Sequence, residues 1–150
     1  MELTHGSHQV YRLEYHLVWC PKYRHPVFTE PYRTILKQII QKAAYDYDME
    51  ILEIEIPPDH IHALVSLPPR ISVSACMRIL KSISAREFFK KYPDIASTYF
   101  WGGKLWSPSY YAETIGKRNE GAIRVYIQHQ LQYEHEHLKK LRQLKLFPSS

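Results

Sequence analysis

The sequence is poor in the residues that build disulfide scaffolds, zinc knuckles and nucleotide-binding loops. Only two of its 150 residues are cysteines, Cys20 and Cys76, and no Cys-x-x-Cys pair is present. A disulfide framework is therefore excluded, and both side chains are expected to be reduced, buried thiols, as in a cytoplasmic protein. Only five residues are glycines, and none lies in a Gly-x-x-x-x-Gly-Lys arrangement, so nothing in the sequence indicates ATP or GTP chemistry.

Long apolar runs are missing as well. No segment approaches the roughly 18 apolar residues that a membrane-spanning helix needs. The first residues lack the basic-then-apolar layout of a signal peptide. There are no internal repeats and no low-complexity linkers, and 150 residues suit one compact domain. These absences predict a single cytoplasmic domain.

What the sequence does contain is an uneven positive charge. The net charge is +5 and the isoelectric point is near 9.1. Residues 1–75 carry 7 Lys/Arg and 9 Asp/Glu, whereas residues 76–150 carry 13 and 6. A basic half on a small, aromatic-rich domain indicates a polyanionic partner such as nucleic acid. The alternative is an ordinary solvated basic surface.

Hydrophobic periodicity predicts alternating strands and helices. Four strands are expected, at residues 10–20, 49–56, 60–67 and 110–114. Alternation places Tyr15, Leu17 and Trp19 on one face of the first strand, and Leu52, Ile54 and Ile56 on one face of the second. Helical spacing predicts three helices: one capped by Thr29 and running to about Tyr47, one from Ser72 to just before Pro93, and one over about 120–144. Residues 94–107 are expected to be irregular. The β-α-β-β-α-β order with an added C-terminal helix predicts an α+β, ferredoxin-like or RRM-like antiparallel sheet with two helices on one face.

The segment Asp59-His60-Ile61-His62 is the strongest chemical motif. Residues two apart on a strand point to the same face, so His60 and His62 would present two imidazoles side by side, as a metal site requires. The alternative is an ordinary pair of half-exposed histidines. His135 and His137 have the same spacing, but they lie in the predicted final helix, where the rings face apart. We therefore do not consider this second pair a ligand set.

Two histidines need a further ligand, and Gln130 is a candidate. Tyr126 and Gln130 are four residues apart and share one face of the predicted helix. Two histidines and an amide oxygen suit Mg²⁺ or Mn²⁺ with a phosphate better than they suit structural zinc. A phenol beside that metal is a nucleophile for phosphodiester cleavage and would form a covalent phosphotyrosine. The alternative for Tyr126 is a packed aromatic in an amphipathic helix.

Several ordered blocks together resemble one known family. The blocks are residues 15–24, 58–62, 81–86, 105–110 and 126–130. They resemble the TnpA-type transposases of insertion sequences that move as single-stranded DNA. This is the HUH single-tyrosine class, named for a His-hydrophobic-His motif. The resemblance covers roughly residues 11–130. It implies a single HUH transposase domain over 1–150, with a core over about 10–131 and a C-terminal helix extension and tail over 132–150.

The resemblance also implies roles for individual residues. Tyr126 would be the catalytic nucleophile, and His60, His62 and Gln130 would hold Mg²⁺ or Mn²⁺, with no nucleotide cofactor. The protein would act in a prokaryotic cytoplasm, associated with the nucleoid, as a homodimer with shared active sites. It would bind single-stranded DNA hairpins near the element ends, cut one strand, leave a 5′-phosphotyrosine and rejoin the ends. The candidate DNA contacts are basic or aromatic: Lys22, Arg24, Arg78, Lys81, Arg86, Trp101, Trp106 and Lys117.

Three other functions remain open at this point. One is a non-catalytic, RRM-like protein that binds single-stranded nucleic acid. Another is a rolling-circle initiator or relaxase, although such enzymes usually have longer chains. The third is a small metallohydrolase, for which Glu53 and Glu55 are the nearest candidate bases. Convergence of the histidines, the glutamine and Tyr126 on one metal would distinguish the transposase from the binding protein.

Overall fold

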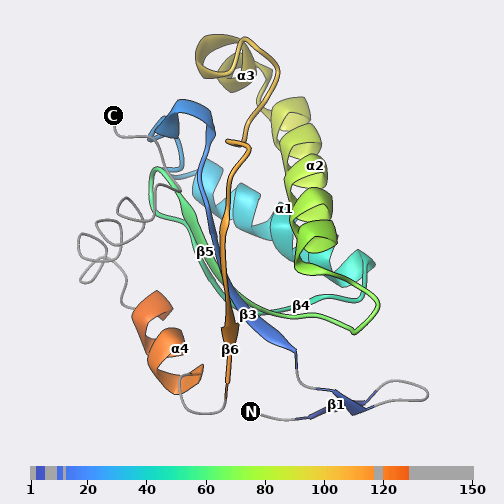
Figure 1. Ribbon diagram of the computed structural model, residues 1–150. Coiled ribbons are helices and arrows are strands. Elements are labelled where there is room, and N and C mark those ends of the chain that lie inside the picture. Colours follow the sequence, from blue (N-terminus) through green and yellow to red (C-terminus); the bar gives the residue numbers. More distant parts are fainter. Residues whose placement is uncertain (1–2, 6–9, 12, 117–119, 129–150) are drawn as a thin grey trace.

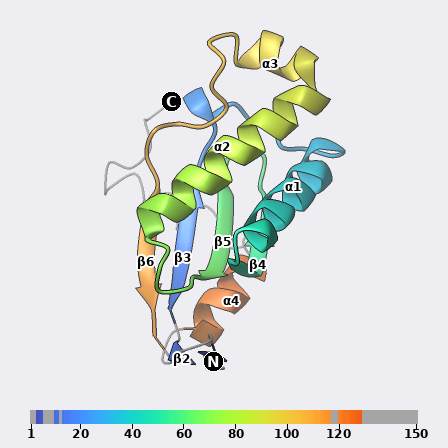
Figure 2. The ribbon, with the colours of Figure 1, turned by 90° about the vertical axis from the view of Figure 1, so that its right-hand side faces the viewer.

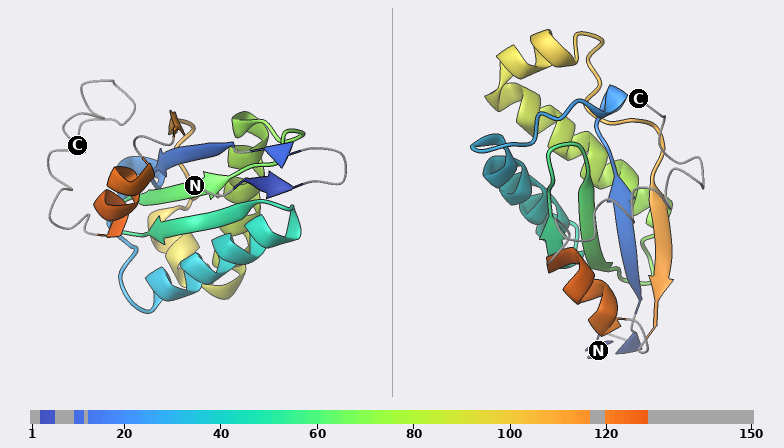
Figure 3. Two further views of the ribbon diagram at one scale, coloured as in Figure 1. Left: turned by 90° about the horizontal axis from the view of Figure 1, so that it is seen from below. Right: turned by 90° about the vertical axis from the view of Figure 1, so that its left-hand side faces the viewer.

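The computed structural model describes residues 3–5, 10–11, 13–116 and 120–128. Its main sheet has four antiparallel strands in the order β4-β5-β3-β6. The strands are β3 (Glu14–Trp19), β4 (Glu50–Glu55), β5 (Ile61–Ser66) and β6 (Tyr111–Ile115). Two helices, α1 (Tyr32–Asp46) and α2 (Val73–Lys91), cover one face of this sheet (Figures 1 and 2). The helix α4 (Glu120–Gln128) lies on the other face (Figure 3).

The element order confirms the predicted fold class: β-α-β-β-α-β with a helix added at the C-terminal side. Ser72 caps α2 as expected, because its hydroxyl accepts a hydrogen bond from the Ala75 amide at 3.0 Å. The described part of α4 ends at Gln128, so the predicted continuation to residue 144 lies outside the described residues. Within the described residues, no helix is both long and apolar enough to cross a membrane.

Three predictions about the extent of helices and strands were wrong. The first predicted strand is divided, because β2 (Val10–Tyr11) pairs with β1 (Thr4–His5) in a separate ribbon, and β3 begins only at Glu14. The region predicted as irregular contains α3 (Pro93–Tyr99), which has its proline in the first turn, where the missing N–H costs nothing. The first main helix begins at Tyr32, and Thr29 contributes its carbonyl to the Arg33 amide and no side-chain cap.

The hydrophobic core fills the space between the sheet and the pair α1 and α2. Alternate residues of β3 and β5 point into it, and the two helices supply the facing side chains. Its fully buried members include Leu17, Trp19, Leu36, Ile40, Ala63, Val65, Leu80 and Phe88. On the opposite face, the described residues form a smaller apolar cluster, where Ile127 of α4 meets Leu64 and Ile115. The two faces of the sheet are therefore packed very differently.

Strand β4 contains a bulge that changes which side chains share a face. Ile51 pairs with Val65, but the next paired residue is Glu53, so Leu52 is the extra residue. Leu52 consequently packs with the cluster under α4, whereas Ile51 and Ile54 pack in the main core. The prediction that Leu52 shares a face with Ile54 was therefore wrong.

Candidate active site

The face of the sheet on which α4 lies, the α4 face, presents histidines because strand side chains alternate. Tyr15, Leu17 and Trp19 of β3 pack in the main core. His16, which lies between Tyr15 and Leu17, therefore points to the other side of the sheet. In β5 the same alternation places Ala63 in the core and His62 on the α4 face. His16 and His62 are both fully buried. Two histidines 46 residues apart in the chain therefore meet on this face.

His60 lies in the turn just before β5, beside His62. Their ring centroids are 4.7 Å apart with an interplanar angle of 74°. Both side chains are fully buried. The predicted side-by-side arrangement of the two imidazoles is therefore present. It arises from the turn and the first residues of the strand, since β5 begins only at Ile61.

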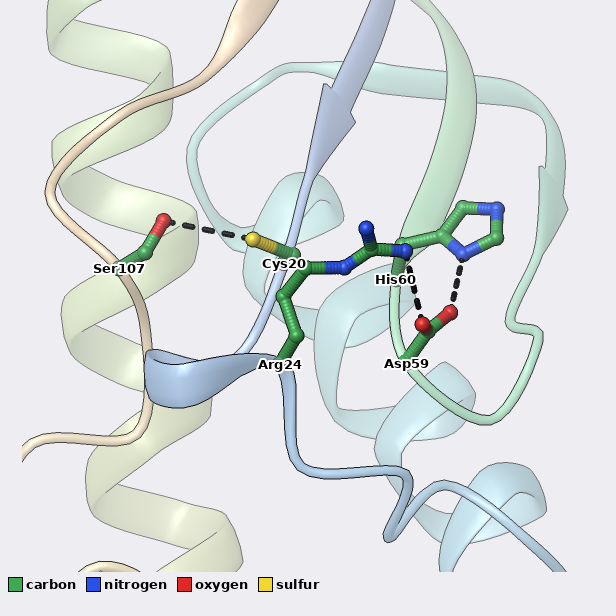
Figure 4. Close-up of polar contacts among 5 residues, drawn as sticks. All are labelled: Cys20, Arg24, Asp59, His60 and Ser107. Atoms are coloured by element: carbon green, nitrogen blue, oxygen red, sulfur yellow. Dashed lines mark hydrogen bonds and ion pairs between the residues drawn. The ribbon is translucent and has the colours of Figure 1, made fainter. Parts of the chain in front are cut away.

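A partly buried ion pair supports His60 (Figure 4). One oxygen of Asp59 lies 2.7 Å from His60 Nδ1, and the other accepts a hydrogen bond from the Arg24 guanidinium at 2.7 Å. Burial alone would raise the pKa of Asp59, but the hydrogen bond and charge of His60, together with Arg24, lower it overall. The carboxylate therefore stays ionised and fixes the orientation of the His60 ring.

The turn that carries Arg24 has an unusual backbone. Tyr23 and Arg24 both lie in the left-handed region, with φ of 62° and 51°. Side chains other than glycine rarely adopt this conformation, so surrounding contacts must hold it. The amide of Lys22 donates to the Leu105 carbonyl at 2.7 Å, and the Arg24 guanidinium is held by Asp59. This turn directs Arg24 inward while Tyr23 remains 61% exposed.

Tyr126 reaches the histidines from α4. Its ring centroid lies 5.6 Å from that of His62 and 6.3 Å from that of His16, in edge-on arrangements. The side chain is half-buried, and the neighbouring Ile127 is fully buried against the sheet. The predicted nucleophile and the predicted metal histidines, more than 60 residues apart in the chain, therefore meet in one place.

The chain matches the family model described as "Transposase IS200 like" over residues 9–130. The ISDra2 transposase TnpA of Deinococcus radiodurans is 38% identical over 130 residues, which cover 87% of this chain and 92% of that protein. The chain belongs to the IS200-like transposase family.

Solved structures show the same relationship for this IS200-like transposase. A crystal structure from Deinococcus radiodurans, described as a transposase, is 35% identical with a TM-score of 0.69, covering 85% of this chain and 97% of that one. A REP-associated tyrosine transposase bound to a REP hairpin has a TM-score of 0.57 at 17% identity, covering 82% and 70%. At that identity the second likeness concerns the fold alone.

Three residues of this site were missed by the sequence analysis. Besides His16, they are Glu113 and Tyr111 of β6. Glu113 Oε1 lies 3.2 Å from His16 Nδ1, and the Tyr111 hydroxyl donates to Glu113 Oε2 at 2.9 Å. The alternation of Tyr15, Leu17 and Trp19 was the available signal for His16. Nothing local indicated Glu113, which is 97 residues from His16 in the chain.

The acidic residues proposed for a metallohydrolase are in β4, at the edge of the sheet, where Glu53 is opposite Leu64 and Glu55 is opposite His62. Glu53 accepts a hydrogen bond from the Gln128 amide at 2.9 Å, and Glu55 pairs with Lys37 of α1 at 3.8 Å. The carboxylates that contact histidines are Asp59 and Glu113. These two carboxylates orient imidazoles, which is the usual role of acidic groups around metal-binding histidines.

His60 and His62 supply two of the donors that a metal site needs. Within the described residues, no group of three or more His, Cys, Asp or Glu is arranged to hold a metal. His60 and His62 would therefore need an additional ligand of another kind, and Gln130, the predicted one, lies outside the described residues. A hydrogen bond holds Nδ1 of each histidine, to Asp59 and to His16 respectively. With the proton on Nδ1, the lone pair resides on Nε2, which is the form that binds a metal.

The candidate DNA contacts fall into two groups. Arg24 is buried on Asp59, Lys81 donates to the carbonyls of Ser107 and Ser109, and the Trp106 indole donates to Ser84. The others present more of their surface to solvent: Lys22 is half-buried, Trp101 is 80% exposed, and Arg78 and Arg86 are exposed on α2. Lys117 lies outside the described residues. Their part in DNA binding stays a prediction.

The neighbouring thiols are structural. Cys20 lies 3.5 Å from the Ser107 hydroxyl and is fully buried, and Cys76 is fully buried in the main core. Burial raises the pKa of Cys20 and raises that of Cys76 to about 12. Both thiols are therefore protonated near neutral pH, whereas nucleophilic chemistry requires a deprotonated thiolate. The prediction of buried, free cysteines is confirmed.

Proposed function

We propose that this transposase cleaves and rejoins single-stranded DNA at insertion-sequence ends through a 5′-phosphotyrosine on Tyr126. The observation that carries the proposal is the convergence of Tyr126, His62 and His60. The ring centroid of His62 lies 5.6 Å from that of Tyr126 and 4.7 Å from that of His60. A protein that only binds single strands has no need to bring a phenol against two buried, oriented imidazoles. Membership of the IS200-like family supports the same chemistry.

The reaction is an exchange of one phosphodiester for another. The Tyr126 oxygen attacks the phosphorus and loses its proton, while the bond from phosphorus to the 3′ oxygen breaks and that oxygen takes up a proton. A 3′ hydroxyl can then attack the phosphotyrosine and restore the original groups. Because the phosphoester bond is conserved at each step, joining needs no ATP.

His60, His62 and Gln130 would hold the divalent cation, Mg²⁺ or Mn²⁺. When bound, this cation supplies positive charge at the phosphoryl oxygens as negative charge develops there. The residues of the chain do the rest. Asp59 and His16 orient the two imidazoles, and the packing of Ile127 holds α4, and with it Tyr126, against the sheet.

The DNA would reach this site over the turn at residues 22–25. Lys22 Nζ lies 5.5 Å from the centroid of the exposed Tyr23 ring, which combines a cation with a stacking surface. Trp101 is a second exposed ring, in the loop joined to this turn by the bond from Lys22 to Leu105. Arg24, in the same turn, contacts Asp59, and Asp59 in turn contacts His60. Unstacked bases held there would place their phosphates near the histidines.

The wider setting is part of the same proposal. The REP-associated relative is bound to a REP hairpin, and we propose hairpins near the element ends as the corresponding substrate here. We also propose that the chain acts as one HUH domain, in the cytoplasm with the nucleoid, as a homodimer with shared active sites. In the structure the Tyr126 ring contacts His62 of its own chain.

The test uses labelled single strands from the DNA that flanks the gene, incubated with Mg²⁺ or Mn²⁺. We expect a covalent protein–DNA adduct on a denaturing gel, formed with single-stranded but not duplex DNA. Tyr126→Phe removes the attacking oxygen and should abolish the adduct, a loss of at least about a thousandfold in rate. Tyr45→Phe, at an exposed tyrosine on α1, is the matched control and should behave as the wild type.

Two results would contradict the proposal. Tight single-strand binding with no adduct in either metal would favour the non-catalytic binding protein. Cleavage that persists undiminished in Tyr126→Phe would favour hydrolysis by water, or a different nucleophile. In the second case the phosphorylated residue would be located by mass spectrometry of the trapped peptide.

A further inference from the structure

His16 is a fully buried histidine with a polar partner on each ring nitrogen. Its Nδ1 lies 3.2 Å from Glu113 Oε1, and its Nε2 lies 3.2 Å from His62 Nδ1. The rings of His16 and His62 are stacked, with centroids 5.5 Å apart and an interplanar angle of 13°. Burying such a polar group is costly unless its hydrogen bonds are satisfied, and here two are made.

The sheet register brings these three side chains together. His16 of β3 is directly opposite Glu113 of β6 and directly opposite Leu64 of β5. His62 is two residues from Leu64 on the same face, so it is the diagonal neighbour of His16. The contacts therefore join three adjacent strands in one row across the α4 face of the sheet.

Counting protons along this row assigns a direction to each hydrogen bond. A carboxylate can only accept, so His16 Nδ1 donates to Glu113. A neutral His16 then has its lone pair on Nε2, and it must accept from His62 Nδ1. With its proton on Nδ1, His62 carries its own lone pair on Nε2. If His16 were instead cationic, the bond would reverse and His62 would carry its proton on Nε2.

Glu113 is itself held in place by Tyr111. The Tyr111 hydroxyl donates to Glu113 Oε2 at 2.9 Å. Burial, and then the bond to this carboxylate, raise the pKa of Tyr111 to about 12, so the phenol remains a donor at any physiological pH. Each oxygen of Glu113 thus accepts one hydrogen bond, and the carboxylate is fixed as an acceptor for His16.

We propose that His16 is a positioning residue which, with Glu113, holds His62 in the tautomer and orientation that present Nε2 to a divalent cation. The inference rests on the proposed function, in which His60 and His62 are metal ligands. It assigns the two ligands different supports. Asp59 orients His60 directly at 2.7 Å, whereas Glu113 orients His62 through the intervening His16 ring. Outer-shell partners of this kind set ligand basicity as well as orientation.

The first measurement is the tautomer of His62 in the metal-free protein. Long-range ¹H–¹⁵N spectra of the imidazoles distinguish a proton on Nδ1 from one on Nε2. We expect His62 to carry its proton on Nδ1 in the wild type. In His16→Leu, which removes the acceptor, the two tautomers should mix. A wild-type His62 protonated on Nε2 would overturn the proposal.

The second measurement is the affinity for Mn²⁺ without DNA, followed by paramagnetic broadening of the imidazole signals. His16→Leu should weaken Mn²⁺ binding by about tenfold or more. His16→Gln should restore most of the affinity, because its amide oxygen accepts from His62 and its NH₂ group donates to Glu113. This rescue separates positioning from simple packing, which Leu satisfies as well as Gln. Equal Mn²⁺ affinity in His16→Leu and the wild type would overturn the proposal.

Two further variants keep the outcome interpretable. Glu113→Ala lies at a partly exposed side chain and tests the same relay if His16→Leu fails to fold; it should weaken Mn²⁺ binding by severalfold. His62→Ala tests the underlying site. If His62→Ala binds Mn²⁺ like the wild type, the proposed metal site is wrong. If His62→Ala loses binding while His16→Leu and Glu113→Ala keep it, only the positioning role is wrong.

Discussion

The two faces of the sheet use the same strands for opposite purposes. Towards α1 and α2, the strands contribute apolar side chains such as Leu17, Trp19 and Val65 to a continuous core. Towards α4, the intervening residues include His16, His62 and Glu113, which are joined by hydrogen bonds, and the apolar cluster that the described residues form there is smaller. Because strand side chains alternate, one backbone provides a scaffold on one side and an ordered polar row on the other.

The contrast shows how the fold can hold buried polar groups. An apolar face supplies the free energy of folding, which is roughly proportional to the area that it removes from water. The polar face contributes less, and its buried imidazoles are tolerated because each has hydrogen-bond partners. The rigidity of the core therefore fixes the register of the polar row. Three predictions test this division.

The largest effect is expected on the core face. Phe88 of α2 is fully buried and makes ring contacts with Phe28, Tyr32 and Tyr92. Phe88→Ala should lower the free energy of unfolding by about 3–5 kcal/mol, through lost burial and a residual cavity. Urea unfolding followed by circular dichroism measures this loss. Lys90→Ala, exposed on the same helix, is the matched control, and a loss below about 1 kcal/mol for Phe88→Ala would contradict the division.

A smaller and more local effect is expected under α4. Ile127 is fully buried, and its apolar cluster among the described residues is smaller than the main core. Ile127→Ala should weaken the docking of α4 by about 2 kcal/mol, because it removes a buried apolar side chain. Amide hydrogen exchange in α4 should quicken by about thirtyfold, with the strands little affected. Val125→Ala, at a half-exposed position of the same helix, should change neither. Uniformly faster exchange in α4 and the sheet would show that the two faces unfold together.

The smallest effect concerns a charge at the rim of the core face. Burial lowers the pKa of Lys81 from its usual value of 10.5, against a weaker opposite influence of Cys20. At pH values between the lowered pKa and 10.5, the unfolded chain binds more protons at Lys81 than the folded chain does. The contribution of Lys81 to the free energy of unfolding therefore rises with pH. The unfolding free energy of the wild type minus that of Lys81→Met should therefore increase from pH 8 towards pH 10.5. Lys90→Met is the control, and a constant or falling difference for Lys81→Met would contradict the assignment.

Much of the fold was predictable because local periodicity reports it. The alternation of Tyr15, Leu17 and Trp19 predicted a strand with one buried face, and Ser72 marked the start of α2. Periodicity could not reveal the bulge at Leu52, because a bulge interrupts the very repeat from which faces are assigned. It also missed α3, whose seven residues are too few to show a helical repeat.

The candidate site, like the fold, was predictable only where short-range spacing places its residues. The pair His60 and His62, and the position of Tyr126 on a helix, follow from spacing within short segments, and these residues were identified from the sequence. The contacts of His16 with Glu113 and of Arg24 with Asp59 join residues 97 and 35 positions apart. No local pattern encodes such contacts, since they depend on how strands pair and how the turn at Arg24 folds inward.

The sequence by itself therefore determined the proposed reactive groups, namely two imidazoles and a phenol, because short-range spacing decides which side chains share a face. Only the tertiary structure decided how those groups are oriented. Strand register sets which side chain opposes which, and it is established by packing of the whole core. The carboxylates that contact His60 and His16 come from a turn and from the edge strand β6. Their positions are properties of the assembled sheet.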